Sequence, residues 1–181
     1  MIQTPATGLP ASPLRPWYRT APRPRGLRIS FDLDDTLTGL GPHIPIESGA
    51  FPRFLQRHLG ESLRHGTRRL MRELRRQGHS VWIYTSSGRS PERIRRWLLL
   101  HGIRVDGIVN DERHHRTARV HGARRWPSKF PPAFGIDLHV DDSEGVAMEG
   151  ATHGFRVVLV TPDDPHWDRK VLHAASACAC R

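Results

Sequence analysis

The sequence lacks long apolar runs, and its cysteines are few and poorly placed for cross-linking. No stretch approaches the roughly 18 apolar residues of a membrane-spanning helix, and the N-terminus has no apolar core like that of a signal peptide. The two cysteines, Cys178 and Cys180, stand one residue apart near the end of the chain. This excludes a disulfide framework and leaves at best half of a metal site. We therefore expect a cytoplasmic protein with no membrane partner.

Lysine is scarce, although the chain is strongly basic. The formal net charge is +10, yet only two of the 28 basic residues are lysine, namely Lys129 and Lys170. A basic surface can bind nucleic acid or phosphorylated substrates. However, the arginines are scattered along the chain, and so strong a preference for arginine is typical of genome-wide codon bias. Charge alone therefore favours nucleic-acid binding only weakly.

The length of 181 residues suits one folded domain with less ordered ends. Residues 1–25 contain six prolines and no periodic apolar pattern, which predicts a disordered arm rich in proline and arginine. We expect the folded domain over 26–172 and a flexible tail over 173–181.

Short apolar strands alternate with helical segments along the domain. The pattern predicts strands at 27–31, 81–84, 107–110, 136–140 and 155–160, and helices at 53–59, 61–78, 90–102 and 144–149. In the third of these helices, Ser90 is suited to the N-cap and Pro91 to the first helical position. The alternation predicts an α/β fold: a doubly wound, Rossmann-like parallel five-stranded sheet with helices on both faces.

Polar residues follow three of the predicted strands where each strand ends. They are "DLDDT" at 32–36, "TSSGR" at 85–89 and "DDS" at 141–143. The carboxyl ends of parallel strands share one edge, so these residues should lie together. Carboxylates so close repel unless a cation such as Mg²⁺ holds them, and the hydroxyls suit phosphate oxygens. Each piece alone is also typical of a turn or helix cap, but the joint placement favours a site.

These segments resemble the motifs of the haloacid dehalogenase-like hydrolases. "FDLDDTLT" resembles their D-x-D-x-T signature, and "VWIYTSS" is similar to the second motif, an apolar strand ending in Thr or Ser. "HVDDSEG" is similar to the fourth motif, in which paired acids end an apolar strand. The third motif is a lysine before the fourth, and Lys129 in "RWPSKFPP" fits it. The resemblance extends from about residue 27 to residue 160.

The resemblance implies a catalytic role for four residues. Asp32 is the nucleophile that forms an aspartyl-phosphate, and Asp34 is the general acid and then the general base. Thr85 and Lys129 hold the phosphoryl group, and Lys129 also contacts Asp32. An acid at position 34 is typical of the phosphatases of this family, so the resemblance implies a phosphomonoester hydrolase.

The resemblance also implies a Mg²⁺ cofactor and places the substrate. The expected metal residues are Asp32, Asp34 through its backbone carbonyl, Asp142, and Asp141 as a further or outer ligand. Beyond the phosphoryl group, the residues predicted to contact substrate are Ser86 and Arg89. Asp35 is interpreted as a turn or cap residue.

Many members of this family carry a cap domain over the site, and this sequence has little room for one. Roughly 25 residues, 37–61, are left between the first motif and the next helix, and the later gap holds only a helix, a strand and a basic loop. We therefore expect no full cap domain and an open site. An open site suits a large substrate such as the end of a macromolecule.

Several alternatives stay open. Segment 110–126, with His114, His115 and His121, is either a rim that grips a polyanion or a solvated basic loop, and we prefer the loop. Three functions are compatible with the sequence. Two are hydrolytic: hydrolysis of a small phosphorylated molecule, and the same chemistry on nucleic-acid ends. The third is non-catalytic binding of a phosphorylated ligand or nucleic acid on the same fold. The intact pair Asp32 and Asp34 favours a hydrolase.

Overall fold

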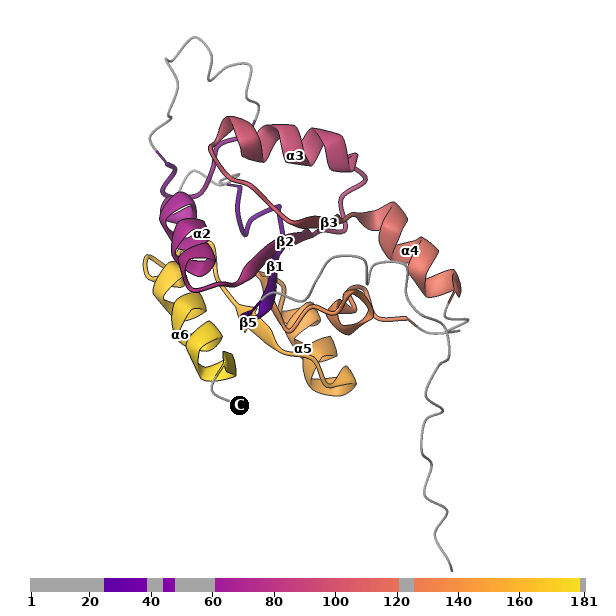
Figure 1. The fold of residues 1–181 in the computed structure, drawn as a ribbon. Coiled ribbons are helices and arrows are strands. Elements are labelled where there is room, and N and C mark those ends of the chain that lie inside the picture. Colours follow the sequence, from indigo (N-terminus) through magenta and orange to yellow (C-terminus); the bar gives the residue numbers. More distant parts are fainter. Residues whose placement is uncertain (1–24, 39–43, 48–60, 121–125, 180–181) are drawn as a thin grey trace, which may run out of the picture.

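A computed structural model describes residues 25–38, 44–47, 61–120 and 126–179. It is an α/β domain built on an all-parallel five-stranded sheet with strand order β3-β2-β1-β4-β5 (Figure 1). The strands are β1 (Arg28–Phe31), β2 (Ser80–Tyr84), β3 (Gly107–Val109), β4 (Leu138–Asp141) and β5 (Val157–Leu159). All five predicted strands are present within two residues of their expected bounds, and the Rossmann-like, doubly wound fold is confirmed. The predicted arm and the helix at 53–59 lie outside the described residues, except for Arg25.

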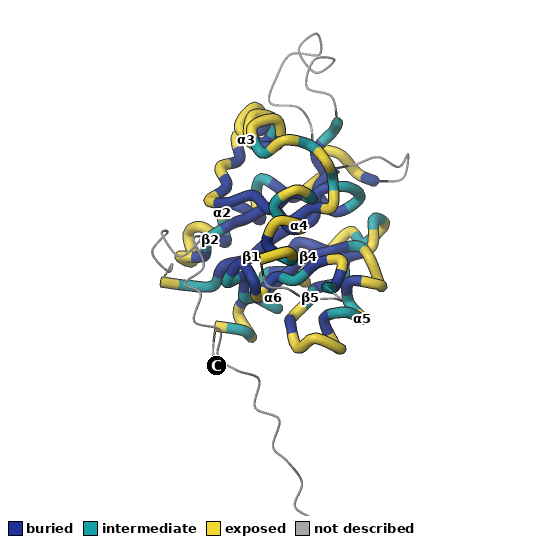
Figure 2. Tube along the Cα trace, turned by 90° about the vertical axis from the view of Figure 1, so that its right-hand side faces the viewer, coloured by how far each residue is buried: buried dark blue, intermediate teal, exposed yellow. Residues whose placement is uncertain are grey.

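Five helices and one 3₁₀ turn surround the sheet in the described part of the chain. They are α2 (Thr67–Arg76), α3 (Pro91–Leu100), α4 (Asp111–Val120), η2 (Pro131–Phe134), α5 (Glu144–His153) and α6 (Trp167–Ala179). Figure 2 shows dark blue, buried strands enclosed by helices whose outer sides are exposed. None of these helices is long and apolar enough to cross a bilayer.

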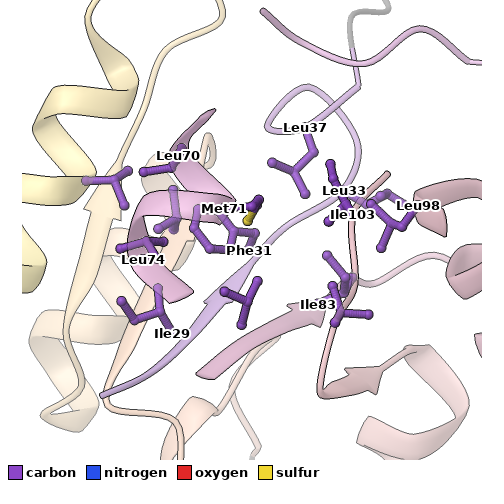
Figure 3. Close-up of a cluster of buried hydrophobic side chains, with 14 of the residues drawn as sticks. Ile29, Phe31, Leu33, Leu37, Leu70, Met71, Leu74, Ile83, Leu98 and Ile103 are labelled. Atoms are coloured by element: carbon purple, nitrogen blue, oxygen red, sulfur yellow. The ribbon is translucent and has the colours of Figure 1, made fainter. Parts of the chain in front are cut away.

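One face of the sheet, here called the apolar face, carries the main hydrophobic core. Alternate strand residues such as Ile29, Phe31 and Ile83 point to this face and are fully buried. Leu70 and Leu74 of α2 pack on them (Figure 3), and α3 and α6 complete the layer. In each of these helices, the apolar residues therefore lie on the side that faces the sheet.

The opposite face, here called the polar face, has a smaller aromatic core. Trp82 and Tyr84 of β2 pack with Phe134 and Ile136, in and beside η2. The strand neighbours of the apolar-face residues, such as Ser30, also point to this side. α4 and α5 cover it, so helices lie on both faces as predicted.

The helix expected at 61–78 is wrong over its first turns. Leu63 and Arg64 instead form antiparallel bridges with Thr38 and Ile46. Gly66 follows with a positive φ of 88° and forms the N-cap of α2, so the helix begins only at Thr67. The segment is helical from Thr67 onward as predicted, but the backbone of Leu63 and Arg64 pairs with the neighbouring segment instead.

Two further helices were not predicted. The segment interpreted as a basic loop contains α4 over Asp111–Val120, whose buried residues are His114 and Thr117 instead of an apolar stripe. The flexible tail expected from 173 is incorrect over 173–179, which form the second half of α6. Val171 and Ala175 of α6 are fully buried against the apolar face. Cys178 lies in this helix and is half-buried against the core.

Candidate active site

A pocket of about 650 Å³ opens at the carboxyl ends of β1, β2 and β4. Strand order reverses between β1 and β4, and ligands bind at such a point in doubly wound sheets. The structure brings all eight residues singled out from the sequence to this pocket. Its lining is Asp32, Asp34, Asp35, Thr85, Ser86, Ser87, Arg89, Ser128, Lys129, Asp141, Asp142, Ser143 and Val146.

A tight turn after β1 aims Asp32 and Asp34 into the pocket. The Asp32 amide donates to the Val140 carbonyl at 2.8 Å, which extends the pairing of β1 with β4 by one residue. The Leu33 carbonyl then accepts hydrogen bonds from the amides of residues 37 and 38. Asp35 has a positive φ of 58°, a conformation that Asp tolerates better than most residues. This agrees with the prediction that Asp35 is a turn residue.

Lys129 lies at the centre of a buried charge network. Its ammonium group donates to Asp32 Oδ1 and to Asp141 Oδ2, both at 2.5 Å, and the residue is only 4% exposed. Asp141 Oδ1 also accepts from the backbone amide of Ser143, and Asp141 Oδ2 is 2.8 Å from His139 Nε2. The lysine therefore bridges the carboxylates that end β1 and β4.

The loop that carries Lys129 is anchored on both sides. The preceding residue, Ser128, donates its amide and hydroxyl to the Glu149 carboxylate of α5, at 2.9 and 2.6 Å. The following residue, Phe130, donates its amide to Tyr84 Oη at 2.8 Å. Because that oxygen already accepts from Phe130, the tyrosine hydroxyl donates its own proton to His114 Nδ1, 2.6 Å away. A short loop without a helix can thus hold a buried lysine in place.

Arg89 holds Asp34 at the mouth of the pocket. Its Nη1 donates to both carboxylate oxygens of Asp34 at 2.8 Å, and its Nη2 donates to Glu61 Oε1 at 2.5 Å. Ser87 Oγ accepts from both the amide and Nη1 of Arg89. Arg89 was predicted to contact substrate, and in this arrangement its guanidinium is shared between two carboxylates.

The hydroxyl residues after β2 differ in exposure. Thr85 is 1% exposed, and its Oγ1 accepts from the Ser87 amide at 3.1 Å. Ser86 is exposed at the pocket rim. The buried hydroxyl therefore lies deep in the pocket, and the exposed one lies where a substrate would enter.

Burial and charge shift the pKa values of the two carboxylates beside Lys129 in opposite directions. The pKa of Asp32 is raised to about 7, because burial and the Asp141 carboxylate, which both raise it, outweigh the Lys129 ammonium, which lowers it. Burial would also raise the pKa of Asp141, but the hydrogen bond from His139 and the charge of Lys129 bring it down to about 2. One ammonium group thus does not fully offset two buried carboxylates, and a further cation near Asp32 would favour its ionised form.

The oxygen donors of the pocket suit a hard cation only in part. Within the described ranges, no group of three or more His, Cys, Asp or Glu side chains is arranged to hold a metal ion. Asp142 accepts from Thr36 Oγ1 through its Oδ1 at 3.0 Å, and Asp32 meets Lys129 through its Oδ1. In contrast, both oxygens of Asp141 already accept hydrogen bonds. Asp32 and Asp142 are therefore better suited to a cation than Asp141 is.

Sequence reasoning missed the residues that support the site. His139 lies inside the apolar strand pattern that precedes the paired acids, and Ser30 lies inside the first strand. Glu61, Tyr84 and Glu149 come from segments assigned to structure alone. A signal was present for His139, because a histidine within an otherwise apolar buried strand needs hydrogen-bond partners.

Comparison with known proteins adds little to what the structure itself shows. No protein-family model matches the chain, and no curated protein matches its sequence. Among solved structures, it is similar to a chain of the Pnkp1/Rnl/Hen1 RNA repair complex, with a TM-score of 0.45 and 16% identity. The match covers 84% of this chain but only 48% of that chain, so the protein spans about half of its length. A likeness of this size assigns neither a family nor an activity.

Proposed function

We propose that the protein is a Mg²⁺-dependent phosphomonoester hydrolase of the haloacid dehalogenase-like type, acting through an aspartyl-phosphate on Asp32. One observation carries this proposal: two carboxylates, two residues apart, face one pocket from different environments. Asp32 is buried and paired with Lys129, whereas Asp34 is partly exposed and paired with Arg89. Carboxylates in such contrasting settings suit two different roles in one reaction.

In the first step, a carboxylate oxygen of Asp32 attacks phosphorus, and the bond from phosphorus to the leaving oxygen breaks. That oxygen takes a proton from Asp34. In the second step, Asp34 removes a proton from water and the water oxygen attacks phosphorus. The bond between phosphorus and the Asp32 oxygen breaks, which releases phosphate and restores the free Asp32 carboxylate. Arg89 donates to both carboxylate oxygens of Asp34, which fixes the orientation of this group at the mouth of the pocket.

Lys129 and Thr85 would bind the oxygens of the phosphoryl group. The Lys129 ammonium is 2.5 Å from Asp32 Oδ1, so it would lie beside the phosphoryl group that this carboxylate attacks. The N-terminus of α5, with Ser143 as its N-cap, also opens on the pocket, and helix N-termini favour anions. Ser86 and Arg89 would contact the substrate beyond the phosphoryl group.

The pocket lining supports a role for Mg²⁺. It contains five aspartates against one lysine and one arginine, so a phosphate dianion would meet net negative charge. Asp32 and Asp142 would hold the ion, with the backbone carbonyl of Asp34 as the resemblance implies. When bound, Mg²⁺ supplies positive charge that offsets the repulsion between Asp32 and the substrate. Asp141 is assigned to Lys129 instead, because its oxygens are already engaged.

The test is hydrolysis of an aryl phosphate by the full chain, with Mg²⁺ and with a chelator. We expect turnover that requires Mg²⁺, is lost in Asp32→Asn and persists in Asp35→Asn. The Asp35 variant is the matched control, because it removes the same charge from a pocket residue with a turn role. An Asp32→Asn variant as active as wild type would overturn the assignment.

A second outcome of the same experiment would favour the non-catalytic alternative. If neither a panel of phosphomonoesters nor an oligonucleotide with a terminal phosphate is hydrolysed, while phosphorylated ligands still raise the unfolding temperature, the pocket is a binding site. The two hydrolase alternatives separate by salt: binding of a nucleic-acid end weakens steeply as salt rises, and binding of a small phosphomonoester changes much less.

A further inference from the structure

We propose that His139 is a positioning residue for Lys129, acting through Asp141. The imidazole fixes the Asp141 carboxylate, and this carboxylate holds the lysine ammonium against Asp32. The kinetic part of this inference rests on the proposed function, whereas its structural part does not.

His139 is the middle of a hydrogen-bonded chain that crosses two strands. The residue lies in β4 on the polar face, is completely buried, and pairs in register with Ser30 of β1. Its Nδ1 is 2.8 Å from Ser30 Oγ, and its Nε2 is 2.8 Å from Asp141 Oδ2. Both ring nitrogens are thus used, as a buried imidazole requires.

The partners decide which nitrogen carries the proton. An ionised carboxylate can only accept, so Nε2 carries the proton that is donated to Asp141. The unprotonated Nδ1 then accepts from the Ser30 hydroxyl. Burial lowers the pKa of His139, which agrees with a neutral ring in this tautomer. Asp141 therefore sets the tautomer, and the Ser30 hydroxyl, which can donate, provides the partner that Nδ1 needs.

Asp141 transmits this arrangement to Lys129. Its Oδ2 is shared by His139 Nε2 and Lys129 Nζ, and its Oδ1 accepts from the Ser143 amide. Without the imidazole, the carboxylate keeps one fixed partner on Oδ1 and can turn about its side-chain bonds. The ammonium would then lose the fixed acceptor opposite Asp32, and a charge displaced by a fraction of an ångström stabilises the reaction less well.

Another buried histidine offers a matched control. His79 precedes β2, is 7% exposed, and its Nδ1 accepts from the Leu27 amide at 3.0 Å. That contact joins two backbone segments at the amino ends of the strands, far from the pocket edge. Replacing His79 therefore perturbs a buried histidine without touching the path to Lys129.

The scarcity of lysine makes a direct measurement possible. With ¹⁵N-labelled lysine, the side-chain spectrum contains signals from only two residues, the buried Lys129 and the exposed Lys170. We expect a distinct, slowly exchanging Lys129 ammonium signal in wild type. His139→Leu should shift the signal and speed its exchange, Ser30→Ala should do so to a smaller extent, and His139→Gln should retain it because its amide places an N–H near the position of Nε2. His79→Leu should leave the signal unchanged.

Kinetics give the second readout. We expect His139→Leu to lower kcat at least tenfold with KM within threefold of wild type, and His139→Gln to recover most of the loss. The Mg²⁺ concentration for half-maximal activity should stay within threefold, because Asp141 holds Lys129 and not the metal. If His139→Leu does not fold, Ser30→Ala carries the same test.

An unchanged Lys129 signal in folded His139→Leu and Ser30→Ala would overturn the inference, as would a raised Mg²⁺ requirement with an unchanged kcat. Absence of turnover in wild type would count against the proposed function alone, because the lysine spectrum still decides the role of His139.

Discussion

The two faces of the sheet have different roles. The apolar face carries Ile29, Phe31, Ile83 and the helices α2, α3 and α6 in one aliphatic core. The polar face carries Ser30, Tyr84 and His139, whose side chains are buried but joined by hydrogen bonds to residues around the pocket. The same strands therefore supply a stabilising surface on one side and a positioning surface on the other.

We therefore expect the two faces to tolerate substitutions differently. Aliphatic packing has no direction, so a substitution there costs stability while the pocket keeps its shape. Hydrogen-bonded groups on the polar face have fixed geometry, so a substitution there should disturb the pocket as well as the fold. Measuring stability and turnover on the same variants separates these two effects.

The largest effect is expected from Lys129→Met. This change removes the ammonium between two buried carboxylates, Asp32 and Asp141. We expect turnover to fall by roughly a thousandfold and the free energy of unfolding to fall by about 3–5 kcal/mol. Steady-state kinetics and urea unfolding measure the two losses. Lys170→Met, at the exposed lysine, should change neither, and equal behaviour of the two variants would contradict the buried network.

Leu70→Ala tests the apolar face. Leu70 is fully buried in α2, and truncation leaves a cavity against the sheet. We expect a loss of about 2–5 kcal/mol in the free energy of unfolding, with kcat per folded molecule unchanged. Leu99→Ala, at a leucine of α3 that is 50% exposed, is the matched control and should be close to neutral. A large drop in kcat for Leu70→Ala would contradict the view that the apolar face affects stability alone.

Tyr84→Phe tests the polar face with a single atom. It removes the hydroxyl that accepts from the Phe130 amide and donates to His114 Nδ1, so two buried partners lose their hydrogen bond. We expect a loss of about 1–3 kcal/mol in stability and a roughly tenfold fall in kcat, because the Lys129 loop loses one anchor. Unfolding and kinetic measurements on the same sample check both. A loss of stability without any change in kcat would show that Tyr84 contributes to stability alone, as the residues of the apolar face do.

Acid should weaken the polar face. Burial lowers the pKa of His114, the nearby charge of His115 lowers it further, and Asp111 raises it. The unfolded chain then binds more protons below about pH 6.5, so the stability that neutral His114 provides is present above that pH and is lost as pH falls. We expect the free energy of unfolding to decline from pH 7.5 to 5.5, and to decline less steeply in His114→Gln. Identical pH profiles of the two proteins would contradict this.

The smallest effect is expected at a surface ion pair. Glu73 of α2 is half-buried and accepts from Arg76 and Gln77, two side chains that are exposed to solvent and salt. Glu73→Gln should leave the unfolding midpoint and kcat unchanged within error at moderate salt. A marked destabilisation would show that exposed pairs matter more in this chain than in most proteins.

The sequence predicted the elements that carry their own signal. The five strands were predicted because each is a short apolar run between turn residues, and α3 was predicted from Ser90 and Pro91, which the structure shows as its N-cap and first residue. α4 escaped because its buried residues are His114 and Thr117, which leave no apolar stripe to read. α6 had such a stripe in Trp167, Val171 and Ala175, but its small and polar residues hid it.

The candidate site divides in the same way. Residues that follow strands could be predicted because the carboxyl ends of parallel strands share an edge, and Lys129 stood out as one of two lysines. The partners of these residues could not be predicted, since Glu61, Tyr84 and His139 reach the site only through tertiary contacts. Spacing along the chain also could not reveal that Asp141 is occupied by Lys129 and His139.

Trapping the phosphorylated aspartate would test directly whether Asp32 is the nucleophile. An aryl phosphate has a good leaving group that needs little help from an acid, so Asp34→Asn should slow the second step more than the first, and this variant mixed with Mg²⁺ and an aryl phosphate labelled in its phosphorus should accumulate the intermediate. After acid quench and digestion, we predict a hydroxylamine-sensitive label on the peptide that contains Asp32, and none when Asp32 is also changed to Asn. Metal-dependent turnover in wild type with no label on this peptide in the variant, or a label that persists without Asp32, would contradict the account.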